Sequence, residues 1–311
     1  MSTMSITDLL NIKTPSPLNE CDFFAGSDHC APQFMIKRDD LIHPIISGNK
    51  WRKLQALFTC EDLFKYEAIV SFGGGFSNHL HAIGFCCQQL NIPFHAMIRG
   101  NYEEQLSPML NDLKTWSAQL HWLTKIEYKN RAQVEFLDKL KDKFPNALFI
   151  AEGGSHQHAL IGMQALIDEL PEEIDAILCP VASAGTMAGL IAAATLTKRH
   201  IEIIGIAMLK GEGYLEDLVT ELLHKMLPEH CQRQQLIKWE IRHDFHCGGY
   251  AKTTDALLQF CKIFSHDTQV PVEPVYSGKL MYAATQLQQQ GQLRDFNKIV
   301  LLHTGGLQGA R

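Results

Sequence analysis

Residues 176–196 read AILCPVASAGTMAGLIAAATL, and the order of features in this stretch decides the fold. Ala176–Cys179 is an apolar run of strand length, a loop of small residues follows it, and an Ala- and Gly-rich helical segment comes next. The same order returns in residues 68–90, which read AIVSFGGGFSNHLHAIGFCCQQL. A strand that leads through a tight loop into a helix is the unit of a parallel α/β sheet.

Strand-like and helix-like segments alternate along the rest of the chain. We predict strands at Phe34–Lys37, Ala68–Phe72, Phe94–Ile98, Leu120–Leu123, Leu148–Ala151, Ala176–Cys179, Glu202–Ala207 and Ile299–Leu302. The 3.6-residue spacing of apolar side chains predicts helices at Leu54–Phe64, Asn78–Leu90, Gln133–Phe144, His158–Leu170 and Gly189–Thr197. This alternation predicts an α/β protein with parallel or mixed sheets and a binding site at the carboxyl ends of the strands.

Composition excludes several classes of protein. The chain has 311 residues, of which 46% are hydrophobic, so it can bury the core of one large or two modest domains. Its net charge is −6 and no basic stripe is visible, so we do not expect nucleic-acid binding. No apolar stretch approaches the ~20 residues of a membrane span, so we do not expect a membrane protein.

The cysteines and the N-terminal residues indicate a cytoplasmic protein. Nine cysteines, an odd number with no CxxC pair, are typical of reduced thiols rather than of a disulfide framework. Met1 to Asn11 lacks the basic and apolar regions of a secretory signal.

The loop after Ala176–Cys179 has the composition of an anion site. Ser183, Ala184, Gly185 and Thr186 combine short hydroxyl side chains with successive backbone N–H groups at the start of a helix. This composition favours a phosphate group as the ligand. The alternative is close packing of helix against sheet, which also selects small residues.

Two lysines lie one helical turn apart in GNKWRKL, residues 48–54, shortly after KRDD at 37–40. Gly48 and Asn49 are loop residues, so Lys50 is expected at a junction between loop and helix, with Lys53 on the same face. One amine could form an imine while the other binds a phosphate. The alternative is an ordinary solvated basic start of a helix.

The glycine loop of residues 73–75 runs into a polar helix start. Ser77 and Asn78 are good helix caps, and glycines allow a ligand close to the backbone. A dinucleotide fingerprint would need Gly where Asn78 stands, so a nucleotide-dependent oxidoreductase is disfavoured. A tight turn followed by a capped helix is the alternative.

Two late segments complete the candidate site. EPVYSGK at 273–279 offers Tyr276 as an acid, base or hydrogen-bond donor, and HTGG at 303–306 places Thr304 at a strand end, where it could face a ring nitrogen. Fifteen histidines raise the question of a metal, but none has the spacing of a known ligand set, so we expect no metal site. An imine-forming lysine, a phosphate loop and a ring-facing hydroxyl together predict pyridoxal 5′-phosphate as the cofactor.

Together these motifs, in this order, resemble the 1-aminocyclopropane-1-carboxylate deaminase/D-cysteine desulfhydrase family from about Phe34 to Gly306. The resemblance implies the two-domain tryptophan-synthase-β-like fold, fold type II, with the cofactor in the cleft between the domains. By resemblance, residues 1–53 and 151–311 form the larger domain, and 54–150 form a smaller inserted one. Family members are usually dimers or larger, so a homodimer is expected.

The resemblance also implies a role for each matching residue. Lys50 would form the imine with the cofactor, Lys53 and Ser183–Thr186 would hold its phosphate, Asn78 would bind the ring 3′-oxygen, and Thr304 would contact the ring nitrogen. Ser77 would lie near the substrate carboxylate or assist proton transfer, and Tyr276 would flank the ring or the substrate. The resemblance also makes Asn78, His79, Tyr250 and Ser277 substrate-binding positions.

Ser277 and Thr304 stand where the deaminases have Glu and Leu, which favours the desulfhydrase-like branch. We therefore predict α,β-elimination from a small amino acid, D-cysteine first, giving pyruvate, ammonia and hydrogen sulfide. The alternatives are a 1-aminocyclopropane-1-carboxylate deaminase and a pyridoxal-phosphate-binding protein with little catalysis. This chain departs from the family at Phe76, at His81 and at residues 251–254.

Overall fold

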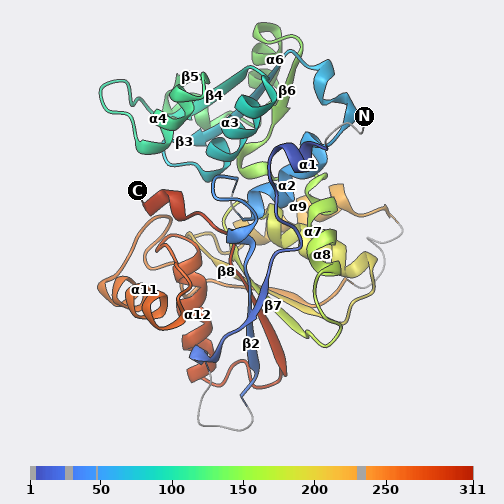
Figure 1. Ribbon diagram of the computed structural model, residues 1–311, viewed down its shortest axis with the longest axis vertical. Coiled ribbons are helices and arrows are strands. Elements are labelled where there is room, and N and C mark those ends of the chain that lie inside the picture. The colour runs from blue at the N-terminus through green and yellow to red at the C-terminus, as the bar shows by residue number, and fades with distance from the viewer. Residues whose placement is uncertain (1–4, 25–30, 47, 230–235, 311) are drawn as a thin grey trace.

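The computed structural model describes residues 5–24, 31–46, 48–229 and 236–310 (Figure 1). Residues 1–4 and 311, at the ends of the predicted larger domain, lie outside this description. The described strands form two separate sheets. The larger sheet has the order β1 (Leu18–Glu20), β2 (Gln33–Lys37), β10 (Lys298–Leu302), β7 (Ala176–Val181), β8 (Glu202–Ala207) and β9 (Trp239–Arg242).

Parallel pairing dominates both sheets. In the larger sheet β1 runs antiparallel to β2, and every other neighbouring pair is parallel. The smaller sheet is parallel throughout, in the order β5 (Gln119–Leu123), β4 (Phe94–Arg99), β3 (Ala68–Gly74) and β6 (Ala147–Ile150). All residues of β7 and β8 are buried, as expected for parallel strands that are covered on both faces.

Three loops meet at one edge of the larger sheet. Leu302 at the end of β10 pairs with Lys37 at the end of β2, and Leu301 pairs with Leu178 of β7. The segments that follow these strands contain KRDD, HTGG and the small-residue loop. The sheet topology therefore places three of the predicted motifs side by side.

Small residues allow the helices beside this edge to pack closely. The helices in contact are α2 (Asn49–Phe58), α7 (Ala159–Asp168) and α8 (Gly185–Leu196). A Cβ atom on Gly162 of α7 would lie 1.7 Å from the backbone oxygen of Arg52, so only glycine fits there. The other α-helices of the described residues are α1 (Ile6–Leu9), α3 (Asn78–Leu90), α4 (Pro108–Thr115), α5 (Lys125–Lys129), α6 (Val134–Lys143), α9 (Tyr214–Met226), α11 (Asp255–Thr268) and α12 (Ser277–Gln289).

All eight predicted strands are present, with ends within two residues of those expected. Two helices differ at their starts. Helix α2 begins at Asn49 rather than Leu54 and ends at Phe58, and α8 begins at Gly185 rather than Gly189. Their first turns begin with polar or small residues at the candidate site, Asn49 and Lys50 in α2 and Gly185 and Thr186 in α8, so apolar spacing starts later than the helix. The predicted domain limits stay a prediction, although the smaller sheet lies wholly within residues 54–150.

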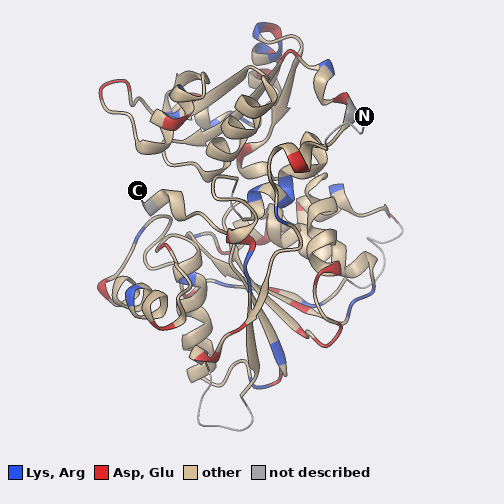
Figure 2. Ribbon diagram, in the orientation of Figure 1, with Lys and Arg blue, Asp and Glu red and all other residues tan. Residues whose placement is uncertain are grey.

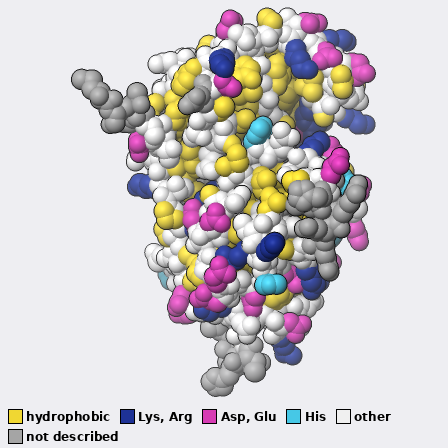
Figure 3. All heavy atoms as spheres, turned by 90° about the vertical axis from the view of Figure 1, so that its right-hand side faces the viewer, with side chains coloured by type: hydrophobic (Ala, Val, Ile, Leu, Met, Phe, Trp, Pro, Cys, Tyr) yellow, Lys and Arg dark blue, Asp and Glu magenta, His cyan; other side chains and the backbone are white. Residues whose placement is uncertain are grey.

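Charges are spread over both lobes of the molecule, with Lys and Arg interspersed among Asp and Glu (Figure 2). On the face shown in Figure 3, hydrophobic side chains gather over the lobe of the smaller sheet. Within the described ranges, no helix has both the length and the apolar character needed to cross a membrane. The seven cysteines of the described part are free thiols.

Candidate active site

Lys50 lies where three of the predicted motifs meet. Gly48, just before α2, has a φ of +67°, and a Cβ there would lie 1.7 Å from the backbone oxygen of Thr304. The Asn49 backbone N–H donates to that same oxygen at 3.3 Å, and Asn49 Nδ2 donates to Thr186 Oγ1 at 2.7 Å. The lysine loop, the HTGG loop and the phosphate loop are therefore joined by direct contacts.

The Lys50 amine has a hydrogen-bond partner and a lowered pKa. Its Nζ donates to Asn49 Oδ1 at 2.6 Å. Burial lowers the pKa of Lys50 to about 8, although the charge of Glu273 opposes the decrease. A lysine amine needs its uncharged form to attack a carbonyl, so this environment suits the predicted imine chemistry.

Lys53 points into the predicted phosphate site beside Ser183–Thr186, called the seat below. The side chain is buried, and its Nζ donates to the backbone oxygen of Gly153. No carboxylate forms an ion pair with Lys53 among the residues that the structure describes. Burial and the nearby charge of Lys50 hold the pKa of Lys53 well below its usual range. A buried amine without an acidic partner fits an anionic ligand.

The wall opposite Lys53 is formed by two loops. Ser155 Oγ contacts the backbone oxygen of Ser183 at 2.7 Å and Ser183 Oγ at 2.9 Å. Ala184 caps α8 with a left-handed φ of 59°. The Gly185 N–H donates to the Ser183 backbone oxygen at 2.7 Å, so it differs from the free donor that the sequence predicts. The turn itself therefore uses one of the backbone donors of the 183–186 loop.

Two histidines border the same seat. Ser71 Oγ donates to Ile150 O at 2.8 Å, so it accepts from His79 Nε2 at 2.9 Å. Burial, followed by the charges of Lys53 and Lys50, holds the pKa of His79 well below its usual range. Burial lowers the pKa of His156 to about 4, and neither ring nitrogen of His156 has a hydrogen-bond partner among the described residues. A neutral His156 has one N–H that no described residue accepts, so this N–H can donate to an anion in the seat.

The glycine loop of the smaller sheet reaches the same place. Ser77 caps α3 by accepting the Leu80 N–H at 3.2 Å, and Asn78 is the first residue of the helix. A Cβ on Gly306 would lie 2.9 Å from Asn78 Nδ2. The site is therefore completed by loops from both sheets. His79 turns away from Ser77 toward Gly154 and Lys53, on the phosphate side of the loop.

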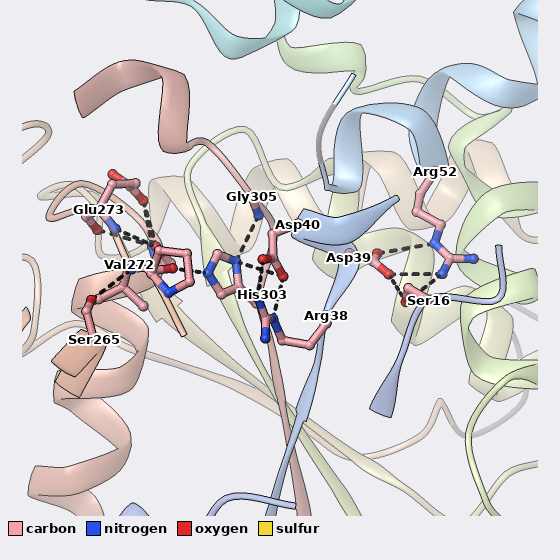
Figure 4. Close-up of polar contacts among 12 residues, drawn as sticks. Ser16, Arg38, Asp39, Asp40, Arg52, Ser265, Val272, Glu273, His303 and Gly305 are labelled. Atoms are coloured by element: carbon pink, nitrogen blue, oxygen red, sulfur yellow. Dashed lines mark hydrogen bonds and ion pairs between the residues drawn. The ribbon is translucent and has the colours of Figure 1, made fainter. Parts of the chain in front are cut away.

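Glu273 is a buried carboxylate that the sequence analysis did not assign to the site (Figure 4). Its Oε1 accepts the backbone N–H groups of Tyr276 and Ser277 at 2.8 and 2.7 Å, and its Oε2 accepts that of Val275 at 2.7 Å. Ser277 Oγ lies 3.2 Å from the same carboxylate. Burial raises the pKa of Glu273. This carboxylate holds the turn that carries Tyr276 and Ser277 at the start of α12.

Two tyrosines meet on the open side of the site. The hydroxyl groups of Tyr250 and Tyr276 lie 2.7 Å apart. Burial, and then the neighbouring Tyr250, hold the pKa of Tyr276 well above its usual range, so Tyr276 is a neutral hydrogen-bonding group. The buried Lys279 donates to the backbone oxygens of His246 and Gly249 at 2.8 and 3.0 Å, which anchors the loop that carries Tyr250.

A buried ionic network lies on the far side of α2 (Figure 4). Arg52 donates to Asp39 at 2.9 Å and forms two bonds of 2.7 Å with Glu169. Lys37 pairs with Glu169 at 2.6 Å, and Ser16 donates to Asp39 at 2.6 Å. Since Arg52 lies between Lys50 and Lys53 in the sequence, this network anchors the turn of α2 that carries both lysines.

His303 supports the HTGG loop from below (Figure 4). The Gly305 N–H donates to His303 Nδ1 at 3.1 Å, so the ring proton is on Nε2, which donates to Pro271 O at 2.7 Å. Asp40 lies 3.7 Å from Nδ1 and forms two bonds with Arg38. This chain of contacts connects the end of β10 with the segment that carries Glu273.

Comparison with known proteins decides the family. A family model described as "Pyridoxal-phosphate dependent enzyme" matches residues 9–305. The chain belongs to this family. It is therefore a pyridoxal-phosphate dependent enzyme, and the predicted cofactor is confirmed.

Individual relatives agree with this family. A mitochondrial Arabidopsis thaliana protein named bifunctional D-cysteine desulfhydrase/1-aminocyclopropane-1-carboxylate deaminase is 26% identical over 296 residues, which cover 89% of this chain and 73% of the relative. The crystal structure of a 1-aminocyclopropane-1-carboxylate deaminase homologue superimposes with a TM-score of 0.80 at 24% identity, over 99% of this chain and 96% of that one. A fungal L-serine ammonia-lyase from Rhizomucor miehei has a TM-score of 0.64 at 16% identity, over 94% and 93% of the two chains. The predicted fold class is confirmed.

In this pyridoxal-phosphate dependent enzyme, the predicted site residues come together from distant parts of the chain. Lys50, Lys53, the 183–186 loop and Thr304 form one connected cluster, and the cluster around Tyr276 lies beside it. Two departures from the family pattern lie elsewhere. His81 pairs with Asp112 at 2.8 Å, toward α4, and Thr254 caps α11 by accepting the Leu257 N–H at 3.2 Å.

Sequence reasoning missed several residues of this site: Asn49, Ser155, His156, Glu273 and Gln308. Asn49 lies inside GNKWRKL and Glu273 inside EPVYSGK, so these two motifs were the available signal. No local pattern distinguishes the others. In the described ranges, no group of three or more His, Cys, Asp or Glu side chains could hold a metal ion.

Proposed function

We propose that this enzyme catalyses α,β-elimination from a small amino acid, D-cysteine first, and releases pyruvate, ammonia and hydrogen sulfide. The observation that carries the proposal is the Lys50 amine, whose pKa is lowered to about 8, together with the nearby buried Lys53, which has no carboxylate partner in the described part of the chain. The name of the Arabidopsis relative supports the substrate class.

The residues present fit the cofactor. Lys50 would bind its aldehyde carbon, and Lys53 with the 183–186 loop would hold its phosphate. Asn78 and Thr304 would face the ring oxygen and the ring nitrogen. When bound, the cofactor supplies the electron sink that stabilises negative charge at the substrate α-carbon.

The protein's own groups would then move protons. The Lys50 amine would take the substrate α-proton, because its lowered pKa keeps part of it uncharged near neutral pH. Asn49 Oδ1 holds the Lys50 Nζ in place, and Ser77 would bind the substrate carboxylate or assist the proton transfer. Tyr276 stays protonated and so can donate a hydrogen bond at the open side of the site.

A second candidate function is 1-aminocyclopropane-1-carboxylate deamination. The sequence predicts a site without the carboxylate that deaminases carry directly after the tyrosine, because Ser277 stands there. The structure, however, places the Glu273 carboxylate 3.2 Å from Ser277 Oγ. A buried carboxylate at this point favours keeping the deaminase reaction as an alternative.

A substrate panel tests these proposals. Purified enzyme loaded with pyridoxal phosphate is assayed for sulfide release from D- and L-cysteine and for 2-oxobutanoate from 1-aminocyclopropane-1-carboxylate, with Lys50→Ala as the inactive control. We expect D-cysteine to have the highest kcat/KM. If 2-oxobutanoate is produced faster than sulfide, the deaminase reaction becomes the main function and D-cysteine elimination the alternative. No turnover of any substrate by cofactor-loaded protein would instead support a binding protein with little catalysis.

We also propose a homodimer in a reducing, cytoplasmic compartment. The hydrophobic side chains gathered on the face in Figure 3 support self-association, and the free thiols support a reducing environment. Sedimentation velocity would test the dimer, and a monomer at micromolar concentration would contradict it.

A further inference from the structure

The C-terminal turn crosses from one sheet to the other. The 3-10 turn η5 (Leu307–Ala310) follows the HTGG loop at the end of β10 and lies between the two lobes (Figure 1). Its backbone is held where the Gly309 N–H donates to Gly306 O at 3.0 Å. The turn therefore starts from the larger sheet and reaches the glycine loop of the smaller one.

Gln308 makes the contact between the C-terminal turn and the glycine loop. Its Nε2 donates to Asn78 Oδ1, and the same nitrogen lies 3.4 Å from the backbone oxygen of Phe76. A side-chain NH₂ group has two hydrogens, so one glutamine can serve both acceptors. Both acceptors lie in the loop and first helical turn that follow β3.

This contact determines which way the Asn78 amide faces. An amide has its oxygen on one side and its nitrogen on the other, so a donor that binds Oδ1 turns Nδ2 to the opposite side. On that side is Gly306, whose added Cβ would lie 2.9 Å from Nδ2. Gly306 has a φ of +94° and no side chain, which leaves room for the NH₂ group beside the HTGG loop.

We propose that Gln308 is a positioning residue that orients the Asn78 amide, so that its NH₂ group faces the ring oxygen of pyridoxal phosphate. The proposal rests on the role proposed for Asn78, but not on which substrate the enzyme turns over. Gln308 would also make cofactor binding depend on the C-terminal turn, because the ring contact comes from one lobe and its orientation from the other.

An isosteric substitution tests this role. Gln308→Glu keeps the shape but replaces the donor with an acceptor, so the Asn78 amide should rotate and turn Nδ2 away from the ring. We expect the Kd for pyridoxal phosphate to rise about three- to tenfold, and the pH midpoint of the bound cofactor's absorbance change to shift. Gln308→Leu should weaken binding by a similar factor, and Gln289→Glu, an added charge on the exposed end of α12, should change neither quantity.

A double-mutant cycle separates this route from a general structural one. If Gln308 acts through Asn78, the variant with both Asn78→Ala and Gln308→Glu should bind the cofactor no more weakly than Asn78→Ala alone. Unchanged Kd and pH midpoint in both Gln308 variants would overturn the proposal, and so would additive losses in the cycle. Because the readouts are cofactor affinity and absorbance, failure of the substrate panel would leave this result intact.

Discussion

The two sides of the candidate site differ in how strongly the protein holds them. The cofactor side, residues 48–53, 153–156, 183–186 and 303–306, consists mainly of buried or half-buried groups with several hydrogen bonds between the loops. The substrate side, formed by Tyr250 and Tyr276, is more open. Tyr250 is 47% exposed and Tyr276 is half-buried.

The contacts of the two sides explain the difference. Gly48 and Asn49 on the cofactor side contact segments that follow three different strands, so a change at one loop disturbs the others. These contacts are with Asp39 after β2, Thr304 after β10 and Thr186 after β7. Tyr250 on the substrate side lies in a loop anchored by Lys279, and its hydroxyl contacts that of Tyr276. We infer that the cofactor side tolerates little change, whereas the substrate side can change without loss of the cofactor.

The largest expected effect comes from removing the covalent contact on the cofactor side. Lys50→Ala should abolish the absorbance band of bound pyridoxal phosphate and lower kcat by at least about 10³-fold, because no other amine occupies that position. Lys53→Ala should keep the band but weaken cofactor binding, because it removes only a phosphate contact. Absorbance spectra of both variants are the measurement, and a band that survives in Lys50→Ala would refute the assignment.

The buried ionic network should contribute strongly to stability. Arg52→Met leaves Asp39 buried without its main partner and should lower the free energy of unfolding by about 3–5 kcal/mol. The matched control is Arg131→Met, because Arg131 and its partner Glu152 are 32% and 36% exposed in their side chains. That variant should lose less than about 1 kcal/mol. Urea unfolding measures both, and equal losses would contradict the proposed support of α2.

The lowered pKa of Lys50 predicts the pH dependence of cofactor capture. Only the neutral amine attacks an aldehyde, so the capture rate of the cofactor-free protein should rise about tenfold per pH unit below pH 8 and level off above it. An ordinary lysine would keep gaining rate up to about pH 10. Stopped-flow absorbance between pH 6 and 10 distinguishes the two profiles.

The smallest effect is expected on the substrate side. Tyr250→Phe removes the 2.7 Å contact with the Tyr276 hydroxyl and should change kcat/KM by about three- to tenfold. Cofactor affinity should stay within about twofold, because Tyr250 lies outside the cofactor side. Tyr282→Phe, in the middle of α12, is the matched control. A large loss of cofactor affinity in Tyr250→Phe would show that the two sides are not independent.

Much of the fold could be predicted from local patterns. All eight predicted strands are present, and Asn78–Leu90 forms α3 with the predicted ends. The sequence predicts late starts for α2 and α8, because the first residues of both helices, Asn49 and Lys50 in α2 and Gly185 and Thr186 in α8, are polar or small and lie at the site. Apolar spacing indicates which side chains pack in a core. It therefore cannot detect the start of a helix that begins at a ligand site.

By itself, the sequence determined the α/β fold class, the two lysines one helical turn apart and the small-residue loop, because spacing and residue type are local properties. Only the tertiary structure decided that Glu273 lies against Ser277, that the Gly185 N–H is used within its own turn, and that Gln308 reaches Asn78. These contacts depend on the direction of individual N–H and C=O groups after distant segments have packed together. The spacing of residue types along the sequence does not specify the direction of these groups.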